Sequence, residues 1–122
     1  MKTRVTELAD VESYTPVGHT NTVAWCLTGK AYGAQNVAVF LIEMRPGAVA
    51  LKHSHLLSEH IFFVLDGRAK ITAEEEVFEV GQGTTVYIPP NIEHEMRTTG
   101  AKVFRAIVVI APPLPEKKPN AY

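Results

Sequence analysis

Four of the five histidines in this sequence fall in two short segments, and their spacing could serve chemistry. The segment HSHLLSEH holds His53, His55 and His60, and the later segment IPPNIEHEM holds His94. Imidazole nitrogen is a borderline ligand that suits zinc, copper, iron, nickel and manganese. Without a metal, a packed cluster is unfavourable, because charging two neighbouring rings is costly. The pattern therefore predicts one metal site built from both segments, whereas His19 stands alone and is typical of a hydrogen-bonding residue.

The spacing within the first segment predicts how strands would position these rings. His53 and His55 are two residues apart, so an extended strand places both side chains on one face. His60 lies five residues beyond His55, and a turn at residues 56–58 would reset the register and bring it to the same side. If His60 points into a barrel, strand alternation directs Glu59 to the opposite face.

The rest of the chain consists largely of short β-type runs between turn signals, and no long helical period stands out. Val, Ile, Phe, Tyr and Thr dominate these runs, as is typical of strands. Parallel βαβ units would need helical connections, for which the chain has no room. An all-β sandwich or barrel is therefore predicted. The expected strands are residues 36–44, 60–65, 69–73, 76–80, 84–88 and 102–110, and the expected turns are residues 45–47, 66–67, 81–83, 89–91 and 98–100.

Two of the expected strands are apolar at nearly every position, at residues 61–65 and 106–110. A strand with one wet face should alternate, so both faces of these strands should be covered. The barrel interior covers one face, and a second subunit would cover the other in a homodimer. The alternative is that residues 1–30 fold back over it. We expect residues 1–30 to form an arm and strands on the barrel or a partner, residues 31–110 the barrel, and residues 111–122 a Pro-rich tail.

Size and charge narrow the class of protein. A chain of 122 residues predicts one domain, and 46% hydrophobic with 20% charged residues is typical of a globular chain. The 12 basic and 13 acidic residues give no bulk reason to bind nucleic acid or an anionic membrane. No apolar run approaches the ~20 residues that span a bilayer. The single cysteine, Cys26, and the absence of a signal-peptide pattern predict the cytoplasm.

The two histidine segments resemble the motifs of the cupin superfamily, small β-barrels that hold a metal. The first motif has the pattern G-x5-H-x-H-x(3–4)-E-x6-G, and the second has the pattern G-x5-P-x-G-x2-H-x3-N. The matching residues are Gly47, His53, His55, His60, Gly67, Gly83, Pro89 and His94. The resemblance implies an all-β, single-domain jelly-roll barrel of the cupin type, but it leaves the function open, because this fold hosts many chemistries.

Three positions depart from the family pattern. His60 occupies the usual glutamate position, because it is separated from Gly67 by six residues. Glu59 fits the shorter of the two spacings that the motif allows after His55, and it is the alternative third ligand. The alternation of side chains along a strand favours His60. Asn91 replaces a glycine, and asparagine tolerates the left-handed conformation that such a turn needs. Thr98 stands where the family has an asparagine that does not bind the metal.

The resemblance implies that the four imidazoles hold one divalent ion of manganese, iron, zinc or nickel. Four protein ligands on an octahedral ion leave two positions for a small-molecule substrate. Glu59, Glu93 and Glu95 are candidate general bases, although solvated surface charge is the favoured interpretation, and Tyr87 could line the mouth. The candidate pocket walls, for which plain core packing is an equal interpretation, are Phe40, Met44, Phe62, Met96 and Phe104.

We therefore expect a metal-dependent enzyme that acts on a small enolisable, aromatic or dicarbonyl compound. A dioxygenase is the first choice of reaction, and an isomerase, cyclase or lyase that works through an enolate is close behind. The alternative from another class is a non-catalytic module that binds a small ligand. A phosphate-binding loop is not indicated, because GQGTTV lacks both the Lys-Ser/Thr ending and a following helix.

Overall fold

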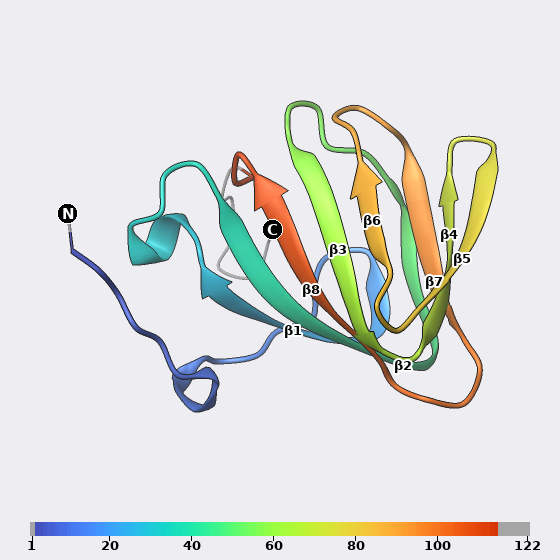
Figure 1. The fold of residues 1–122 in the computed structure, drawn as a ribbon, viewed down its shortest axis with the longest axis horizontal. Helices are drawn as coiled ribbons and strands as arrows, with labels where there is room; N and C mark the ends of the chain where they lie inside the picture. Colours follow the sequence, from blue (N-terminus) through green and yellow to red (C-terminus); the bar gives the residue numbers. More distant parts are fainter. Residues whose placement is uncertain (1, 115–122) are drawn as a thin grey trace.

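The computed structural model describes residues 2–114, which form one curled antiparallel sheet of eight strands (Figure 1). Two short 3-10 helices, η1 (Leu8–Asp10) and η2 (Lys30–Tyr32), lie before and after the first strand. The strands are β1 (His19–Thr28), β2 (Ala38–His53), β3 (Glu59–Asp66), β4 (Arg68–Ala73), β5 (Glu76–Gly81), β6 (Thr85–Ile88), β7 (His94–Thr99) and β8 (Phe104–Ala111). The all-β prediction is confirmed. Within residues 2–114, neither helix has the length and apolarity that crossing a membrane requires.

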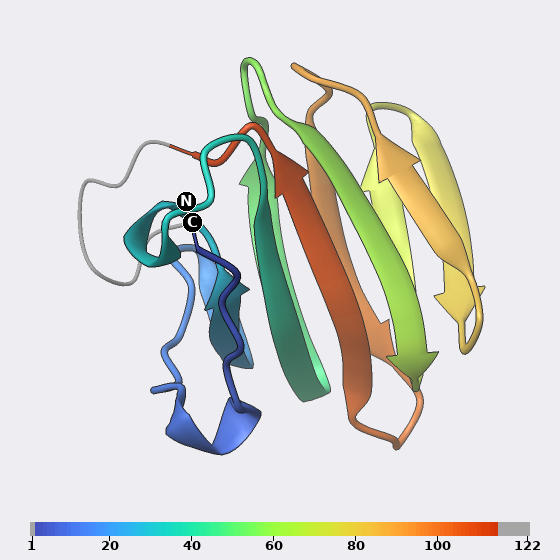
Figure 2. The ribbon, with the colours of Figure 1, turned by 60° about the vertical axis from the view of Figure 1, so that its left-hand side comes forward.

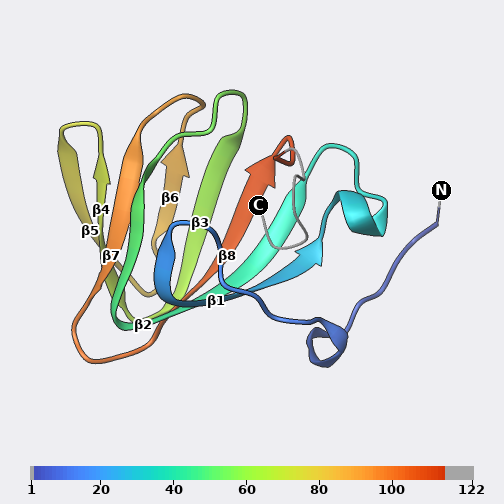
Figure 3. The same ribbon diagram turned by 180° about the vertical axis from the view of Figure 1, so that it is seen from behind.

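The order of the strands explains how the sheet curls into two layers. Neighbours run β5-β4-β7-β2-β8-β3-β6, and β1 pairs with β2. The first half of β2 pairs with β8 and its second half pairs with β7, so β2 belongs to both layers of the curled sheet. The layer that contains β8 and β3 faces the layer that contains β7 and β4 (Figures 2 and 3).

The space between the two layers is filled by one cluster of buried apolar side chains. Phe62 and Val108 enter it from one layer, and Ile71 and Met96 enter it from the other. Along β8 the alternation is strict, with buried residues at every second position. Because strand side chains alternate between faces, every buried residue of these strands points to the interior that also receives the histidines.

The turn predicted at residues 45–47 is wrong, because β2 runs through this stretch without ending. Residues here lie in an irregular part of the strand, between the ladder with β8 and the ladder with β7. The hydroxyl of Thr98 accepts a hydrogen bond from the Ala48 N–H (3.1 Å) and donates one to the Arg45 carbonyl (2.9 Å). These bonds replace the missing ladder, so the left-handed Gly47 (φ 81°) bends the strand without ending it.

Two turns outside β2 hold residues that the family motif singles out. Gly67, at the β3–β4 turn, has φ 79°, and a Cβ there would lie 2.6 Å from the Val103 carbonyl oxygen and 2.7 Å from the Phe104 Cα. Glycine is therefore required by both conformation and close approach. Asn91 has φ 63°, so the predicted left-handed turn is confirmed. Its N–H donates to the His55 carbonyl (2.7 Å), which ties the second histidine segment to the first.

The N-terminal part contributes strand β1, which lies within the residues 1–30 where strands were expected without bounds. β1 pairs with β2 over most of its length, and Tyr14 forms a further bridge to Ala24 at the edge of β1. At the other end, β8 extends to the first residue of the predicted tail. Residues 115–122 of that tail lie outside the described residues.

Candidate metal centre

Pairing between β2 and β7 brings the two histidine segments together. His53, the last residue of β2, is the register partner of His94, the first residue of β7. His55 follows in the connection to β3, and bends at residues 56–57 turn the chain so that β3 can begin. The second residue of β3 is His60, whose side chain is buried. Segments about 40 residues apart in the chain thus supply side chains to one place, as the sequence predicted.

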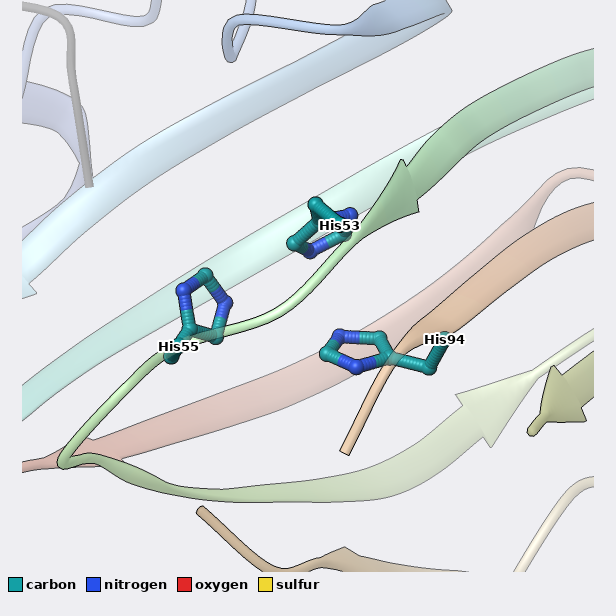
Figure 4. A group of neighbouring side chains, drawn as sticks. All are labelled: His53, His55 and His94. Atoms are coloured by element: carbon teal, nitrogen blue, oxygen red, sulfur yellow. The ribbon is translucent and has the colours of Figure 1, made fainter. Parts of the chain in front are cut away.

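The rings of His53, His55 and His94 form a compact group (Figure 4). One nitrogen from each ring lies within 4.8 Å of the other two. The ring centroids of His53 and His94 are 4.3 Å apart, and those of His53 and His55 are 4.9 Å apart. Small side-chain rotations would bring the three nitrogens onto one ion, since zinc–nitrogen bonds are ~2.0–2.1 Å long.

Backbone carbonyls orient two of these rings. The Nδ1–H of His53 donates to the Leu51 carbonyl (2.7 Å), and the Nδ1–H of His94 donates to the Ile92 carbonyl (2.9 Å). A proton on Nδ1 leaves the lone pair of Nε2 free, so each hydrogen bond selects the tautomer in which Nε2 can bind a metal. The chain therefore prepares both rings as ligands.

His60 lies beside this group on the inner face of β3. Its ring centroid is 5.2 Å from that of His55 and 5.4 Å from that of His94, and it packs against Phe62 at 4.5 Å. The burial of His60, together with the exposure of Glu59, confirms the predicted assignment of the two residues to opposite faces. The three-residue group does not include His60, so its role as a fourth ligand stays a prediction.

The unpaired nitrogens test whether these residues fit a metal. Nε2 of His53, His55 and His94 and both nitrogens of His60 are buried and have no hydrogen-bond partner among residues 2–114. Each unsatisfied buried polar atom costs about 1–3 kcal/mol, so five of them in one place substantially lower the stability of a small domain. A cation that accepts these lone pairs removes much of this cost. The donor set suits manganese, iron, zinc or nickel.

The electrostatics of the site keep these rings neutral. Burial, followed by repulsion from His53 and His94, lowers the pKa of His55 to about 4. Burial and the neighbouring rings lower the pKa of His60 well below its usual value. The pKa of His94 is also lowered by burial, although the hydrogen bond to the Ile92 carbonyl acts in the opposite direction. Since metals bind neutral imidazole, the site can take a cation at pH 7 without first losing protons from these three rings.

The structure also brings His19 into the electrostatic environment of the site. Its register partner is Ala50 of β2, and burial followed by repulsion from His53 lowers the pKa of His19 to about 4. Sequence reasoning treated this residue as isolated because the strands expected in residues 1–30 were given neither bounds nor register. The continuous apolar run at residues 23–27 is the signal that could have located a strand there.

The candidate acid–base residues lie at the periphery. Glu59 points to the outer face of β3, where the Tyr87 hydroxyl donates to its carboxylate at 2.8 Å. Glu93 is exposed and forms an ion pair with Lys52 at 3.8 Å. Glu95 is half-buried on the face of β7 opposite to His94. Catalytic roles for these residues stay predictions.

The five candidate pocket walls all belong to the apolar core. Phe62 packs directly against His60, and Phe40 lines a cavity of about 210 Å³ together with Tyr14 and Ile110. No histidine lines this cavity, but Ile110 is the register partner of His60. The cavity therefore lies on the same inner face as the histidines, about one strand away.

Known proteins resemble this chain over most of its length. Polyketide synthase CurC of Streptomyces cyaneus is 27% identical over 116 residues, which cover 95% of this chain and 74% of CurC. The uncharacterized protein MJ1618 of Methanocaldococcus jannaschii is 37% identical over 67 residues, which cover 55% of this chain and 54% of MJ1618. The match therefore spans about half the length of that relative.

Among solved structures, the polyketide cyclase RemF from Streptomyces resistomycificus superposes with a TM-score of 0.79 and 26% sequence identity. The superposition covers 95% of this chain and 83% of the RemF chain. A model of the cupin domain family matches residues 40–110, the segment that runs from β2 to β8 and holds all four motif histidines. The chain therefore belongs to the cupin family.

Proposed function

We propose that this cupin is a metal-dependent cyclase that closes a ring in a polyketide-type substrate, a chain in which carbonyl and methylene groups alternate. The similarity to the polyketide cyclase RemF, at 26% identity over 95% of this chain, carries the proposal. The similarity to CurC, which is named as a polyketide synthase, points to the same class of substrate.

The composition of the histidine group suits such a substrate. His53, His55 and His94 would hold a divalent cation, which would supply Lewis-acid chemistry for carbonyl oxygens. Among the described residues, no carboxylate belongs to this group, so the protein does not neutralise the charge of the ion. Uncompensated positive charge favours anionic oxygen ligands. A β-dicarbonyl unit ionises readily and offers two oxygens, which makes it a fitting ligand.

The chain itself would orient and shield the substrate. The carbonyl-anchored rings of His53 and His94 fix the direction from which a substrate oxygen can approach. The wall that contains Phe62 and its register partner Val108 is buried and apolar, so it would keep water away from a reactive carbon. The cavity beside Phe40 offers space on the same inner face for the rest of the substrate chain.

An oxygen-dependent reaction is the second candidate, and the dioxygenase ranked first on the sequence stays a prediction. The same open positions that suit a dicarbonyl compound would suit a substrate together with dioxygen. The similarity to RemF favours ring closure over oxygen insertion. The two reactions differ in their products: ring closure by aldol condensation forms one carbon–carbon bond and releases one water, whereas a dioxygenase adds both atoms of dioxygen.

The test uses the purified protein, its metal content and a short linear poly-β-ketone thioester. Elemental analysis identifies the bound metal, and mass spectrometry follows the product with and without oxygen. Loss of one water under anaerobic conditions supports the cyclase, provided that His53→Ala abolishes it and the exposed variant Glu79→Gln does not. A product that forms only when oxygen is present, and that contains two more oxygen atoms than the substrate, supports the dioxygenase. Tight binding without turnover indicates a ligand-binding module.

A further inference from the structure

The cavity of about 210 Å³ is formed largely by residues outside the part of the chain that the family model matches. That part is residues 40–110, and only Phe40 and Ile110 of the lining residues belong to it. The N-terminal segment around Tyr14, η2 and residues 113–114 supply much of the remaining wall. The flanking segments of this chain therefore build the cavity against the inner face of the sheet.

The cavity has an apolar floor and a polar mouth. Ala38, Phe40 and Ile110 form the floor and are at most 6% exposed. Glu12 and Lys30 also line the cavity but are exposed, so they mark the side on which it meets solvent. Protein interiors are close-packed and contain few voids larger than a water molecule. A cavity with this lining is suited to an apolar group that enters from solvent.

One inward-facing row of residues connects the cavity with the candidate metal centre. Ala38 of β2, Ile110 of β8 and His60 of β3 are successive register partners, and all three are buried. The row crosses two strand spacings of ~4.8 Å, so His60 lies about 10 Å from the side of the cavity that β2 forms. One elongated molecule can therefore reach both places, with an oxygen at the histidines and an apolar end in the cavity.

The volume of the cavity limits the size of this apolar end. An apolar cavity of about 150 Å³ is large enough to bind benzene, which has about six carbon atoms to place. At the same degree of filling, a cavity of about 210 Å³ takes about eight carbon atoms. A phenyl group with a short linker fits this space, as does an alkyl chain of similar size, whereas two joined rings exceed it.

We propose that the cavity is a binding site for one apolar group of the size of ethylbenzene. Binding of such a group does not require the metal. In the cyclase reaction, and here the inference rests on the proposed function, the bound group is the end of the substrate chain that carries no ketone. Holding this end in the cavity fixes which carbonyl groups of the chain lie at the histidines, and thus which ring forms.

Gly29→Leu is the variant that fills the cavity. A Cβ at Gly29 would lie 3.5 Å from the Cys26 Sγ and 3.6 Å from the Ala38 Cβ, which is ordinary contact with two residues of the lining. The backbone of Gly29 is extended (φ 170°), so a leucine there meets no backbone strain. Ala101→Leu, on the exposed turn before β8, adds a leucine away from the cavity and is the matched control.

Binding of ethylbenzene to the full chain is measured by a titration that follows backbone amide resonances, in metal-free and metal-loaded protein. The natural protein and Ala101→Leu should bind it with equal affinity, and Gly29→Leu should bind it at least about tenfold more weakly, because leucine occupies the space. Biphenyl should bind the natural protein at least about tenfold more weakly than ethylbenzene, because it is too large. Circular dichroism confirms that both variants are folded. No saturable binding of ethylbenzene by the natural protein, or equal affinity in Gly29→Leu, overturns the site.

Turnover separates this inference from the proposed function. Two linear poly-β-ketone thioesters are compared, one ending in a phenyl group and one in a methyl group. The ratio of their kcat/KM values should fall at least about tenfold in Gly29→Leu and stay unchanged in Ala101→Leu. An unchanged ratio in Gly29→Leu contradicts the positioning role of the cavity. Saturable ethylbenzene binding without turnover of either thioester supports the binding site and contradicts the cyclase.

Discussion

Gly67→Ala and Gly83→Ala form a matched pair that isolates the cost of close backbone approach. Both glycines belong to the histidine motifs, and their φ values are 79° and 83°. An alanine at either position has to adopt a left-handed conformation, which costs about 1–2 kcal/mol. The Cβ would meet nothing within 4 Å at Gly83, whereas at Gly67 it would lie 2.6 Å from the Val103 carbonyl oxygen and 2.7 Å from the Phe104 Cα.

Relieving this overlap requires the β3–β4 turn to move away from the start of β8. Forced displacement of this kind costs about 1–3 kcal/mol. We therefore expect Gly83→Ala to lower the free energy of unfolding by about 1–2 kcal/mol and Gly67→Ala by about 2–5 kcal/mol. The entropy that alanine removes from the unfolded chain is the same in both variants and cancels in the comparison.

Urea unfolding of the metal-free protein, followed by circular dichroism, measures both values under one condition. Removing the metal is important because a bound ion would stabilise the folded state and mask the difference. Equal losses in the two variants would show that the turn yields freely, and the reasoning from close approach would then be refuted.

Three further predictions concern the site and its support. His60→Gln should weaken cobalt or zinc binding at least about tenfold in competition with a chelating dye, whereas Glu59→Gln should not; equal affinities would exclude His60 as a ligand. In the metal-free protein, the pKa of His55 is about 4 against 6.5 in the unfolded chain. The unfolded state therefore takes up this proton at a higher pH than the folded state does, so the free energy of unfolding is highest above pH 6.5 and falls as the pH is lowered from 6.5 towards 4; His55→Gln should flatten this pH dependence in urea unfolding. Thr98→Val loses both hydrogen bonds to β2 and should cost about 1–3 kcal/mol in urea unfolding, whereas an unchanged midpoint would argue against the bracing role.

Patterns within short stretches of the sequence were enough to predict several features of this protein. Alternation placed His60 and Glu59 on opposite faces because neighbouring side chains of a strand always point apart. The left-handed turn at Asn91 followed from a property of that residue type alone. The spacing of histidines and glycines identified the cupin motifs, and with them the fold, because motif spacing is written in a single stretch of chain.

Pairing between distant strands decided the rest. The partnership of His53 with His94, the approach of His19 to His53 and the continuity of β2 all depend on register between segments many residues apart. The periodicity of one segment does not predict such register, because the register depends on how the whole sheet curls and packs. For the same reason, the apolar strands predicted that both of their faces are covered, but only the folded sheet shows that Leu41 and Ile107 of neighbouring strands are register partners.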